Sequence, residues 1–427
     1  MIRKIQNYML LVFSLLLLSS VQAQSPPSLS LEDCYALARE NHPQAKEAPL
    51  INQATALRLQ NLRTQWWPKV ALYGQATLQS EVTSLPIELP GIEIETLAKD
   101  QYKLYAEINQ TLYDGGANRV QRKLQTLQQA VESQALEVKL FQVREGIDQA
   151  FFGILLLDEQ LAQLELLEKD LITAQEKIQA AIDNGLAFQS QKDILQAERL
   201  KLKQRRIEIN AGKQAFAALL SRMTGQEINP ETEFERPSLL LEPSTSLSLN
   251  RPELALFQKQ SKLISAQSQM LEVRKMPKAG LFVQGGYGRP ALNFLSNAFT
   301  PYAIGGLRVS WDLNSFYTQT NDLQLIDIQR QQLSVQEASF RYQIDLQASG
   351  QTEEITKLKA LLATDQEIID LREKIQKTSQ AQLENGVLTA NDYVRELNAA
   401  DQARQNQIIH QTQLLLAQYQ LKSLYNN

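Results

Sequence analysis

The sequence has few of the residue types from which most enzyme sites are built. Its 427 residues include one cysteine, Cys34, and two histidines, His42 and His410. A single cysteine excludes an internal disulfide and a thiolate metal cage, and neither histidine has a carboxylate cluster at ligand spacing. We therefore predict no enzymatic activity, no cofactor and no metal site. Cys34 is interpreted as a buried thiol in a short helix, and His410 as a solvated or interhelical polar group.

Two further absences narrow the function. The segment Gly285-Gly286-Tyr287-Gly288 lacks the Lys and Ser/Thr of a phosphate-binding loop and the helix of a dinucleotide fingerprint, so we interpret it as a strand end beside a loop. The formal net charge is −4, and no basic stripe stands out. A nucleic-acid partner is therefore not expected.

Glycine and proline are also scarce over long intervals. The 17 glycines and 14 prolines gather in a few places, which predicts helices far longer than the globular mean of about 11 to 12 residues. Beyond the N-terminus no apolar stretch reaches the roughly 20 residues of a transmembrane helix. Membrane contact by the mature chain would then require strands or surface helices.

The N-terminus has the pattern of an export signal. A positively charged start precedes the apolar residues 9–18, and Val21-Gln22-Ala23 forms a small-residue cleavage site. A transmembrane anchor is the alternative, but the apolar run is shorter than a span requires. We therefore predict that residues 1–23 are a signal peptide.

An internal duplication runs through the rest of the chain, because three landmarks recur in the same order about 200 residues later. The pairs are Trp66-Trp67-Pro68-Lys69 with Lys275-Met276-Pro277-Lys278, Thr111-Leu112-Tyr113-Asp114 with Val309-Ser310-Trp311-Asp312, and Ala181-Ile182-Asp183-Asn184-Gly185-Leu186 with Gln382-Leu383-Glu384-Asn385-Gly386-Val387. We predict a first structural repeat over residues 24–228, a Pro- and Ser-rich linker over 229–251, and a second repeat over 252–427.

Both repeats follow one plan: an amphipathic helix, a strand hairpin, a very long helix, an Asn-Gly break and a shorter return helix. The expected helices cover residues 31–62, 116–182 and 189–223, and then 252–273, 316–383 and 391–424. At 1.5 Å per residue, each long helix measures on the order of 100 Å. Two apolar stripes follow the first long helix, one through Leu157, Leu161, Leu164, Leu171, Ile178 and Ile182, the other through Leu167, Leu171, Ala174, Ile178 and Ala181. Two stripes indicate two helical neighbours, as in a closed ring.

Four segments alternate apolar and polar residues with the period of a strand: residues 70–80, 102–113, 279–287 and 302–312. This alternation suits a transmembrane barrel strand and a half-buried soluble strand equally. Four strands find no soluble sheet partner elsewhere in the chain, and a single-chain membrane barrel needs about eight. Since an open edge is not viable in lipid, the membrane interpretation requires several chains to pool their strands.

The order of these elements resembles the TolC-like outer membrane efflux proteins through nearly the whole mature chain. The marks that carry the resemblance are the opening Leu29-Ser30-Leu31-Glu32-Asp33 with Ala36-Leu37-Ala38 and Asn41-His42-Pro43, the strand exit Leu112-Tyr113-Asp114-Gly115-Gly116, and the two Asn-Gly hairpin tips. The fold class implied is mostly α with transmembrane β. The resemblance also implies a homotrimer whose pooled strands form one twelve-stranded outer membrane barrel, continued into the periplasm by a coiled-coil barrel of helices.

The resemblance further implies a passive exit duct of a tripartite efflux or type I secretion system, surrounded by outer membrane lipid and working with a periplasmic adaptor and an inner membrane pump. The two tips, Asn184-Gly185-Leu186 and Asn385-Gly386-Val387, match the periplasmic ends that meet the partner proteins.

In the family, acidic residues shortly after the second tip narrow the entrance, and Asp392 occupies that place. The next acidic position of the pattern is Arg395 here. This departure puts a two-ring acidic gate in doubt, and the two side chains are candidates for an ion pair within or between subunits.

Two other functions remain open from the residues. A periplasmic adaptor of the same pumps would also be exported and helical, but it would contain one helical hairpin between soluble β-domains. This chain repeats hairpin and strands twice. A coiled-coil scaffold of the envelope is the second alternative, and resistance to carbonate washing separates a barrel from both.

Overall fold

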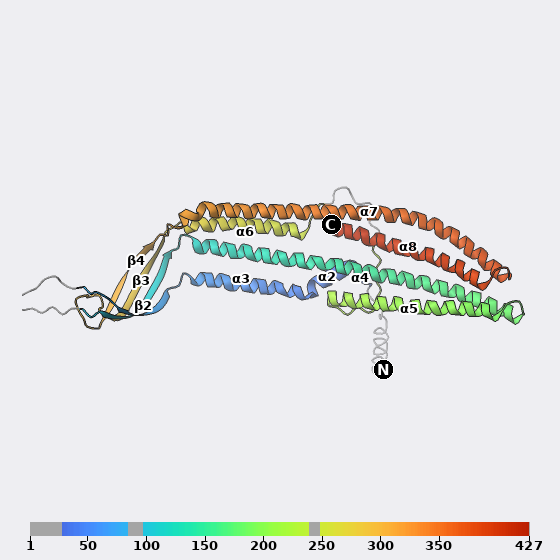
Figure 1. The fold of residues 1–427 in the computed structure, drawn as a ribbon, viewed down its shortest axis with the longest axis horizontal. Helices are drawn as coiled ribbons and strands as arrows, with labels where there is room; N and C mark the ends of the chain where they lie inside the picture. Colours follow the sequence, from blue (N-terminus) through green and yellow to red (C-terminus); the bar gives the residue numbers. More distant parts are fainter. Residues whose placement is uncertain (1–27, 84–96, 239–247, 427) are drawn as a thin grey trace, which may run out of the picture. The chain divides into compact units, whose positions relative to one another are not determined.

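The computed structural model describes residues 28–83, 97–238 and 248–426. The predicted signal peptide lies outside them, as does part of the predicted linker. The elements, labelled as in Figure 1, are α2 (Leu31–Asn41), η1 (Pro43–Lys46), α3 (Glu47–Thr64), β1 (Lys69–Leu78), β2 (Asp100–Tyr113), α4 (Ala117–Asp183), α5 (Gln189–Thr224), α6 (Pro252–Arg274), β3 (Lys278–Arg289), β4 (Thr300–Ser310), α7 (Ser315–Glu384) and α8 (Ala390–Tyr425). Within these described ranges, no helix combines the length and the apolar character needed to cross a membrane.

The predicted strands and long helices are confirmed to within a few residues, but the helix expected over residues 31–62 is wrong as a single element. It is divided into α2, η1 and α3. The division falls at His42, whose backbone is extended at φ −58° and ψ 135°. The reason is Pro43, because its ring disfavours the helical conformation for the preceding residue. The first helix is also fixed at its start, where Ser30 and Asp33 form a reciprocal capping box.

The chain divides into two compact units, and each draws on both predicted repeats. The helical unit consists of the described parts of residues 1–45, 139–251 and 344–427. The strand unit consists of the described parts of residues 46–138 and 252–343. α4 and α7 each contribute one portion to each unit.

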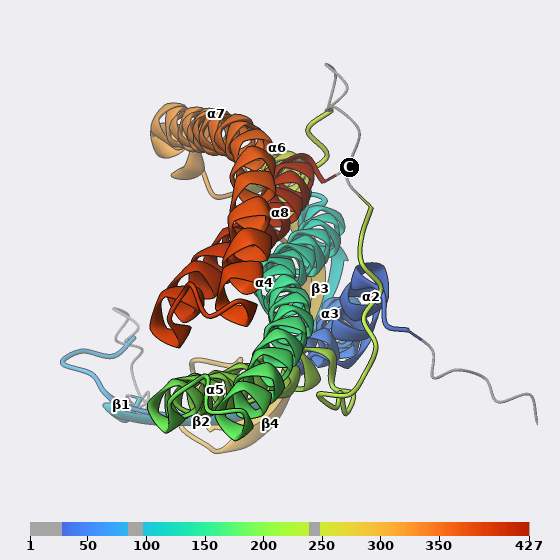
Figure 2. The same cartoon turned by 90° about the vertical axis from the view of Figure 1, so that its right-hand side faces the viewer.

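Two helical hairpins make up most of the helical unit, α4 with α5 and α7 with α8 (Figure 2). One buried cluster joins them and includes residues from both predicted stripes of α4. Its members are Leu164, Leu167, Leu171, Ala174 and Ile178 of α4, Leu195 and Leu202 of α5, Leu383 of α7, and Ala390, Tyr393, Val394 and Leu397 of α8. The helical neighbours predicted from the stripes therefore include helices of the same chain.

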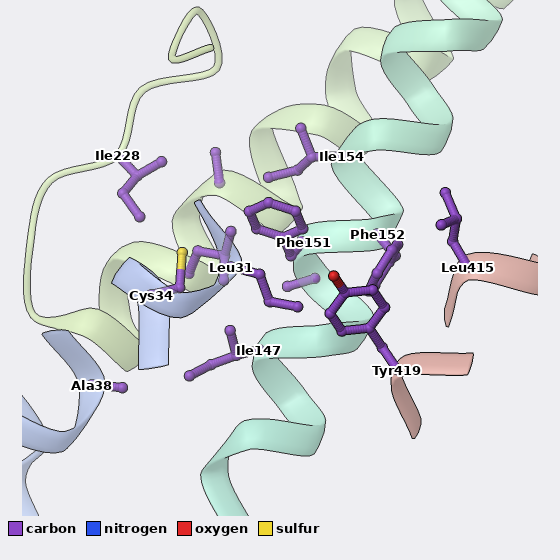
Figure 3. Close-up of a cluster of buried hydrophobic side chains, with 13 residues drawn as sticks. Leu31, Cys34, Ala38, Ile147, Phe151, Phe152, Ile154, Ile228, Leu415 and Tyr419 are labelled. Atoms are coloured by element: carbon purple, nitrogen blue, oxygen red, sulfur yellow. The ribbon is translucent and has the colours of Figure 1, made fainter. Parts of the chain in front are cut away.

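A second cluster packs α2 against α4 and the C-terminal parts of α5 and α8 (Figure 3). Phe151 and Phe152 of α4 meet edge-to-face with centroids 5.9 Å apart, and Phe152 also contacts the ring of Tyr419 at 5.6 Å. Cys34 lies in this cluster with no exposed surface, which confirms the predicted buried thiol. Burial, reinforced by the charges of Asp33 and Glu32, raises its pKa to about 12, so the thiol stays protonated and inert.

A buried polar pair lies beside this cluster. The hydroxyl of Tyr35 on α2 donates to Oδ1 of Asp148 on α4, and the guanidinium of Arg144 lies 5.0 Å from the centroid of the Tyr35 ring. Burial raises the pKa of Asp148 from 3.8 to about 6, although the bond from Tyr35 and the charge of Arg144 oppose the shift. Burial and the adjacent carboxyl also raise the pKa of Tyr35.

Polar bridges connect the helices of this unit elsewhere. Nδ1 of His410 on α8 lies 2.6 Å from Oδ2 of Asp365 on α7, so of the two roles predicted for this histidine, solvated or interhelical, it has the interhelical one. Asp401 of α8 accepts from Gln163 of α4 at 3.1 Å and pairs with Arg205 of α5 at 3.3 Å. Because Asp401 is buried, one carboxylate fixes the relative position of three helices.

The strand unit contains one antiparallel sheet in the order β1-β2-β3-β4, with each strand paired to its sequence neighbour. The sheet joins one strand hairpin from each predicted repeat through the β2–β3 pairing. One bulge interrupts β2 between Thr111 and Tyr113. The outer edges of β1 and β4 have no strand partner among the described residues.

The raised pKa of Asp148 makes the stability of the fold depend on pH. Because the folded state favours the protonated carboxyl, its contribution is complete below pH about 4 and is lost as the pH rises through about 6. The shift corresponds to on the order of 3 kcal/mol. Asp148→Asn keeps the acceptor for Tyr35 without the titration. We expect the variant to exceed the parent in thermal-unfolding midpoint at neutral pH, and the two to converge at low pH.

The matched control is Asp193→Asn, which removes an exposed carboxylate of α5 and should follow the parent at every pH. An unfolding midpoint with the same pH dependence in Asp148→Asn and in the parent would contradict the assignment.

Candidate functional site

The register of the sheet gathers its apolar residues on one side. Leu72 lies opposite Ala106, Ala106 opposite Gly285, and Gly285 opposite Ala303. Directly opposed residues share a face, so these rows define an apolar face. It comprises Val70, Leu72, Gly74, Ala76 and Leu78 of β1, Tyr102, Leu104, Ala106 and Ile108 of β2, Ala279, Leu281, Val283, Gly285 and Tyr287 of β3, and Pro301, Ala303, Gly305, Leu307 and Val309 of β4. Three polar residues, Asp100, Gln110 and Arg289, also lie on this side by register.

This apolar face is the more exposed of the two. Leu72 is 73% exposed and Leu104 57%, whereas Glu107 and Asn109, which point the other way, are half-buried. A half-buried strand in a soluble protein shows the reverse, with apolar side chains covered and polar ones in water. The sheet is therefore the reverse of a half-buried soluble sheet, and its exposed apolar side matches the pattern of membrane-barrel strands.

The opposite side of the sheet is the polar face. It comprises Lys69, Ala71, Tyr73, Gln75 and Thr77 of β1, Gln101, Lys103, Tyr105, Glu107, Asn109 and Thr111 of β2, Lys278, Gly280, Phe282, Gln284, Gly286 and Gly288 of β3, and Thr300, Tyr302, Ile304, Gly306, Arg308 and Ser310 of β4. The guanidinium of Arg308 pairs with Glu107 at 3.1 Å and lies 4.5 Å from the centroid of the Phe282 ring. Tyr73 and Tyr105 stack with centroids 5.1 Å apart.

The close packing of rings on the polar face depends on Gly286. A Cβ at this position would lie 2.5 Å from Cβ of Tyr105 and 2.7 Å from the carbonyl oxygen of Leu104. Real carbon atoms do not approach so closely. The glycine therefore leaves the space in which Tyr105 crosses toward β3.

Aromatic side chains border the apolar face at both ends. At the helix end lie the exposed Trp66, Trp67, Tyr113 and Trp311, and at the loop end Tyr102, Tyr287 and Phe299. The bulge in β2 places Tyr113 opposite Ala279 and thus on the apolar face. Aromatic girdles of this kind mark the two interfaces of a membrane barrel. Sequence reasoning had used Trp66 and Trp67 only as landmarks of the repeat.

The two hairpin tips have the same backbone geometry. At the first, Gly185 has φ +72°, its N–H donates to the carbonyl of Ile182 at 2.8 Å, and Leu186 N–H donates to that of Ala181 at 2.8 Å. At the second, Gly386 has φ +71° and Val387 N–H donates to the carbonyl of Gln382 at 2.8 Å. Both are Schellman caps, which require a residue in the left-handed region. Asn184 and Asn385 each donate from Nδ2 to the carbonyl four residues earlier at 2.7 Å.

Apolar side chains project from both tips. Leu186 is 81% exposed, Val387 76% and Phe188 75%. Phe188 is a tip residue that sequence reasoning missed, although its position just before the polar return helix α5 was a usable signal. Near the tips, a salt bridge between Lys177 of α4 and Glu384 of α7 connects the two hairpins, and its hydrogen bond from Lys177 lowers the pKa of Glu384.

Asp392 and Arg395 are brought together at the start of α8, with Oδ1 and a guanidinium nitrogen 3.4 Å apart. Arg395 also contacts Glu396 at 3.3 Å, and Glu396 pairs with Arg372 of α7 at 3.3 Å. These four side chains form a network of two carboxylates and two guanidiniums. We call it the entrance network, because the resemblance predicts that Asp392 lies at the entrance. Sequence reasoning missed Glu396, although it directly follows Arg395. It also missed Arg372, because that residue lies on a different helix, α7.

Asp392 has a second, local role. Its backbone N–H donates to Oγ1 of Thr389 at 3.2 Å, and the Thr389 hydroxyl donates to Oδ2 of Asp392 at 2.7 Å. Thr389 is the N-cap of α8. Asp392 is therefore part of a helix cap as well as of the entrance network.

Comparison with known proteins gives no match by sequence, since no family model matches the chain and no curated protein matches it. Solved structures do match. VceC, an outer membrane protein of Vibrio cholerae, has a TM-score of 0.64 at 14% identity, with 92% of this chain and 95% of that chain covered. CusC, which changes conformation on folding and transmembrane channel formation, has a TM-score of 0.69 at 10% identity, with 94% of this chain and 92% of that chain covered. The MtrE outer membrane channel of Neisseria gonorrhoeae has a TM-score of 0.62 at 13% identity, with 92% and 88% covered.

These likenesses extend over nearly the whole of each chain. The chain therefore has the fold of the TolC-like outer membrane channels, which confirms the predicted combination of long helices with a four-stranded sheet.

The positive φ at the tips generates a test of their geometry. No atom lies within 4 Å of a Cβ built on Gly185 or Gly386, so a larger residue there meets no neighbour, only backbone strain. Gly185→Val should cost about 1 to 2 kcal/mol in local stability, and limited proteolysis should cut the first tip faster. Gly185→Asn, which tolerates the left-handed region, should stay near the parent.

Gly350→Val is the matched control, because a Cβ on Gly350 also meets nothing within 4 Å but its backbone is helical. Cleavage rates that are equal in Gly185→Val and Gly350→Val would show that the positive φ carries no strain.

Proposed function

We propose that the chain is a subunit of a passive outer membrane channel, the exit duct of a tripartite efflux or type I secretion system, with a large periplasmic portion. The observation that carries the proposal is the exposed apolar face, bordered by aromatic side chains at both ends. An exposed apolar surface of this size is expected to contact lipid or another protein. The aromatic side chains at both ends of the face favour lipid, because such girdles lie at the interfaces of membrane barrels.

The free edges of the sheet support assembly from several copies. Neither β1 nor β4 has an outer partner among the described residues, and unpaired backbone groups are not viable in hydrocarbon. β1 and β4 run in opposite directions, so β4 of one copy can pair antiparallel with β1 of the next. Repeating this contact closes a ring. Three copies give the twelve strands that the TolC-like fold implies.

An apolar row on α7 supports the same assembly. Leu325, Ile328, Val335 and Tyr342 are all exposed, and the last three follow one another at intervals of seven. This is the heptad spacing of residues that pack against a partner helix in a coiled coil. We assign the seam to a helix of the neighbouring copy.

The tips are the proposed contact with a periplasmic adaptor, with an inner membrane pump as the source of energy, because no nucleotide-binding motif occurs in the sequence. Leu186, Phe188 and Val387 offer apolar anchors to such a partner. Gly185→Val and the equivalent Gly386→Val are expected to abolish efflux while leaving insertion into the membrane intact. Loss of both efflux and membrane insertion in these variants would show that the glycines serve folding alone.

An adaptor or an envelope scaffold is less consistent with the sheet. Either would be expected to keep apolar strand residues covered in water, whereas here they are the exposed ones. No observation on the described residues favours these alternatives.

The apolar face is tested by matched substitutions on β1 and β2. Leu72→Arg and Ile108→Arg place a charge on the apolar face and should cost roughly 2 to 4 kcal/mol near the bilayer midplane. Gln75→Arg places the same charge on the polar face and should be tolerated. The measurement is recovery of cross-linked trimer from carbonate-washed outer membranes.

The unchanged protein should remain in the washed membrane and cross-link as a trimer. Its release by carbonate, cross-linking that stops at monomer or dimer, or equal recovery of Leu72→Arg and Gln75→Arg would contradict the proposal.

The entrance network is proposed as a gate. Asp392, Arg395, Glu396 and Arg372 link α8 to α7 next to the second tip, where copies around one axis would meet at the narrow end of the tunnel. Exposed pairs of this kind contribute about 0 to 1 kcal/mol each, so opening requires only modest work. Asp392→Ala should raise single-channel conductance in planar bilayers and weaken block by multivalent cations.

Thr389→Ala is the control for the helix cap, because it removes the hydroxyl that holds Asp392 N–H but keeps the carboxylate. Unchanged conductance and cation block in Asp392→Ala, or the same change in Thr389→Ala, would leave Asp392 with the helix-capping role alone.

A further inference from the structure

We propose that the polar face of the sheet gives the barrel a preference for anions, so that the solutes it passes most readily are negatively charged. This inference rests on the proposed function, because it takes the polar face as the lining of the pore. It is carried by an uneven distribution of charge between the sheet and the rest of the chain.

The polar face has four cations, Lys69, Lys103, Lys278 and Arg308, against one carboxylate, Glu107. The whole chain has a formal net charge of −4. The strand lining is therefore positive in a protein that is negative overall. Such an imbalance confined to one face of four strands indicates a local electrostatic function.

The single carboxylate is already neutralised. Glu107 lies 3.1 Å from the guanidinium of Arg308 and accepts a second hydrogen bond from Asn109 at 2.7 Å. Lys69, Lys103 and Lys278 have no ion-pair partner among the described residues. In the part of the chain that the structure describes, three ammonium groups on the polar face therefore lack a counter-charge, and their donors suit carboxylates and phosphates.

These lysines lie near both ends of the sheet. Lys69 and Lys278 begin β1 and β3 at the helix end, opposite Asn109 and Ser310 respectively. Lys103 lies toward the loop end of β2, opposite Gln75 and Gly288. A solute crossing a lining built from several copies would therefore pass positive charge at entry and at exit. Low-dielectric walls around such a passage focus the field within it.

Binding of lipid headgroups is the other role for lysine near a membrane interface. The register argues against it, because the three lysines are on the face opposite the exposed leucines and valines. The one ion pair placed with the apolar side, Arg289 with Asp100, is internally neutral. The entrance network also balances its two carboxylates with two guanidiniums, so it supplies no opposing net charge.

The experiment measures reversal potentials of the detergent-extracted full-length protein in planar bilayers under a potassium chloride gradient. At about 0.1 M salt the screening length is near 10 Å, so the lysines can act across part of the pore. We expect chloride to be more permeant than potassium. The triple variant Lys69→Glu, Lys103→Glu, Lys278→Glu should invert this order, and the triple Lys→Arg variant should retain it. In 1 M salt, where the screening length is about 3 Å, the preference should shrink.

Two neutral variants keep the test decisive if charge reversal prevents folding. Replacing the three lysines by glutamine should remove most of the preference, and Glu107→Gln should strengthen it. Channels that prefer potassium, or that keep their selectivity in the glutamine variant, would overturn the inference and leave the proposed channel in place. Preparations that insert and conduct no ions at all would instead overturn the proposed function.

Discussion

The outward apolar face of the sheet is the constraint on which the rest of the structure depends. β1 to β4 satisfy one another's backbone groups, yet within the described ranges neither β1 nor β4 has an outer partner, and the sheet exposes apolar side chains. In water this sheet would be an aggregation site. In lipid the apolar side chains would be in a favourable environment, but the unpaired backbone groups at the sheet edges would not. The closed ring of copies that we propose would remove both difficulties.

The helices α4 and α7 meet a different requirement, because at 67 and 70 residues they are far longer than one globular core. Their stability comes from packing repeated along their length, by heptad apolar residues and by polar bridges between hairpins. The bridges use partly exposed ion pairs and buried groups such as Asp401 and Asp148. Contacts spread along the helices in this way hold them in register.

Much of the fold was predictable because it depends on patterns within short stretches of the sequence. Period-two alternation located the four strands, and the scarcity of Gly and Pro located the long helices. The Asn-Gly pairs identified both tips, since the left-handed cap favours glycine. The first helix was predicted too long because the effect of Pro43 on His42 was not weighed against the apolar pattern. At the entrance, Asp392 and Arg395 were found as neighbours on one helix, whereas Arg372 comes from another.

The sequence by itself determined the elements, their order and the residues with special backbone geometry, because these depend on interactions within a few residues. The tertiary structure decided which sheet face is exposed, because that depends on cross-strand register and on the absence of a covering layer among the described residues. It also decided that Arg308 compensates Glu107, that Tyr113 is aligned with the apolar face, and that Glu396 joins α8 to α7. Each of these joins residues from different elements, whose approach only packing can fix.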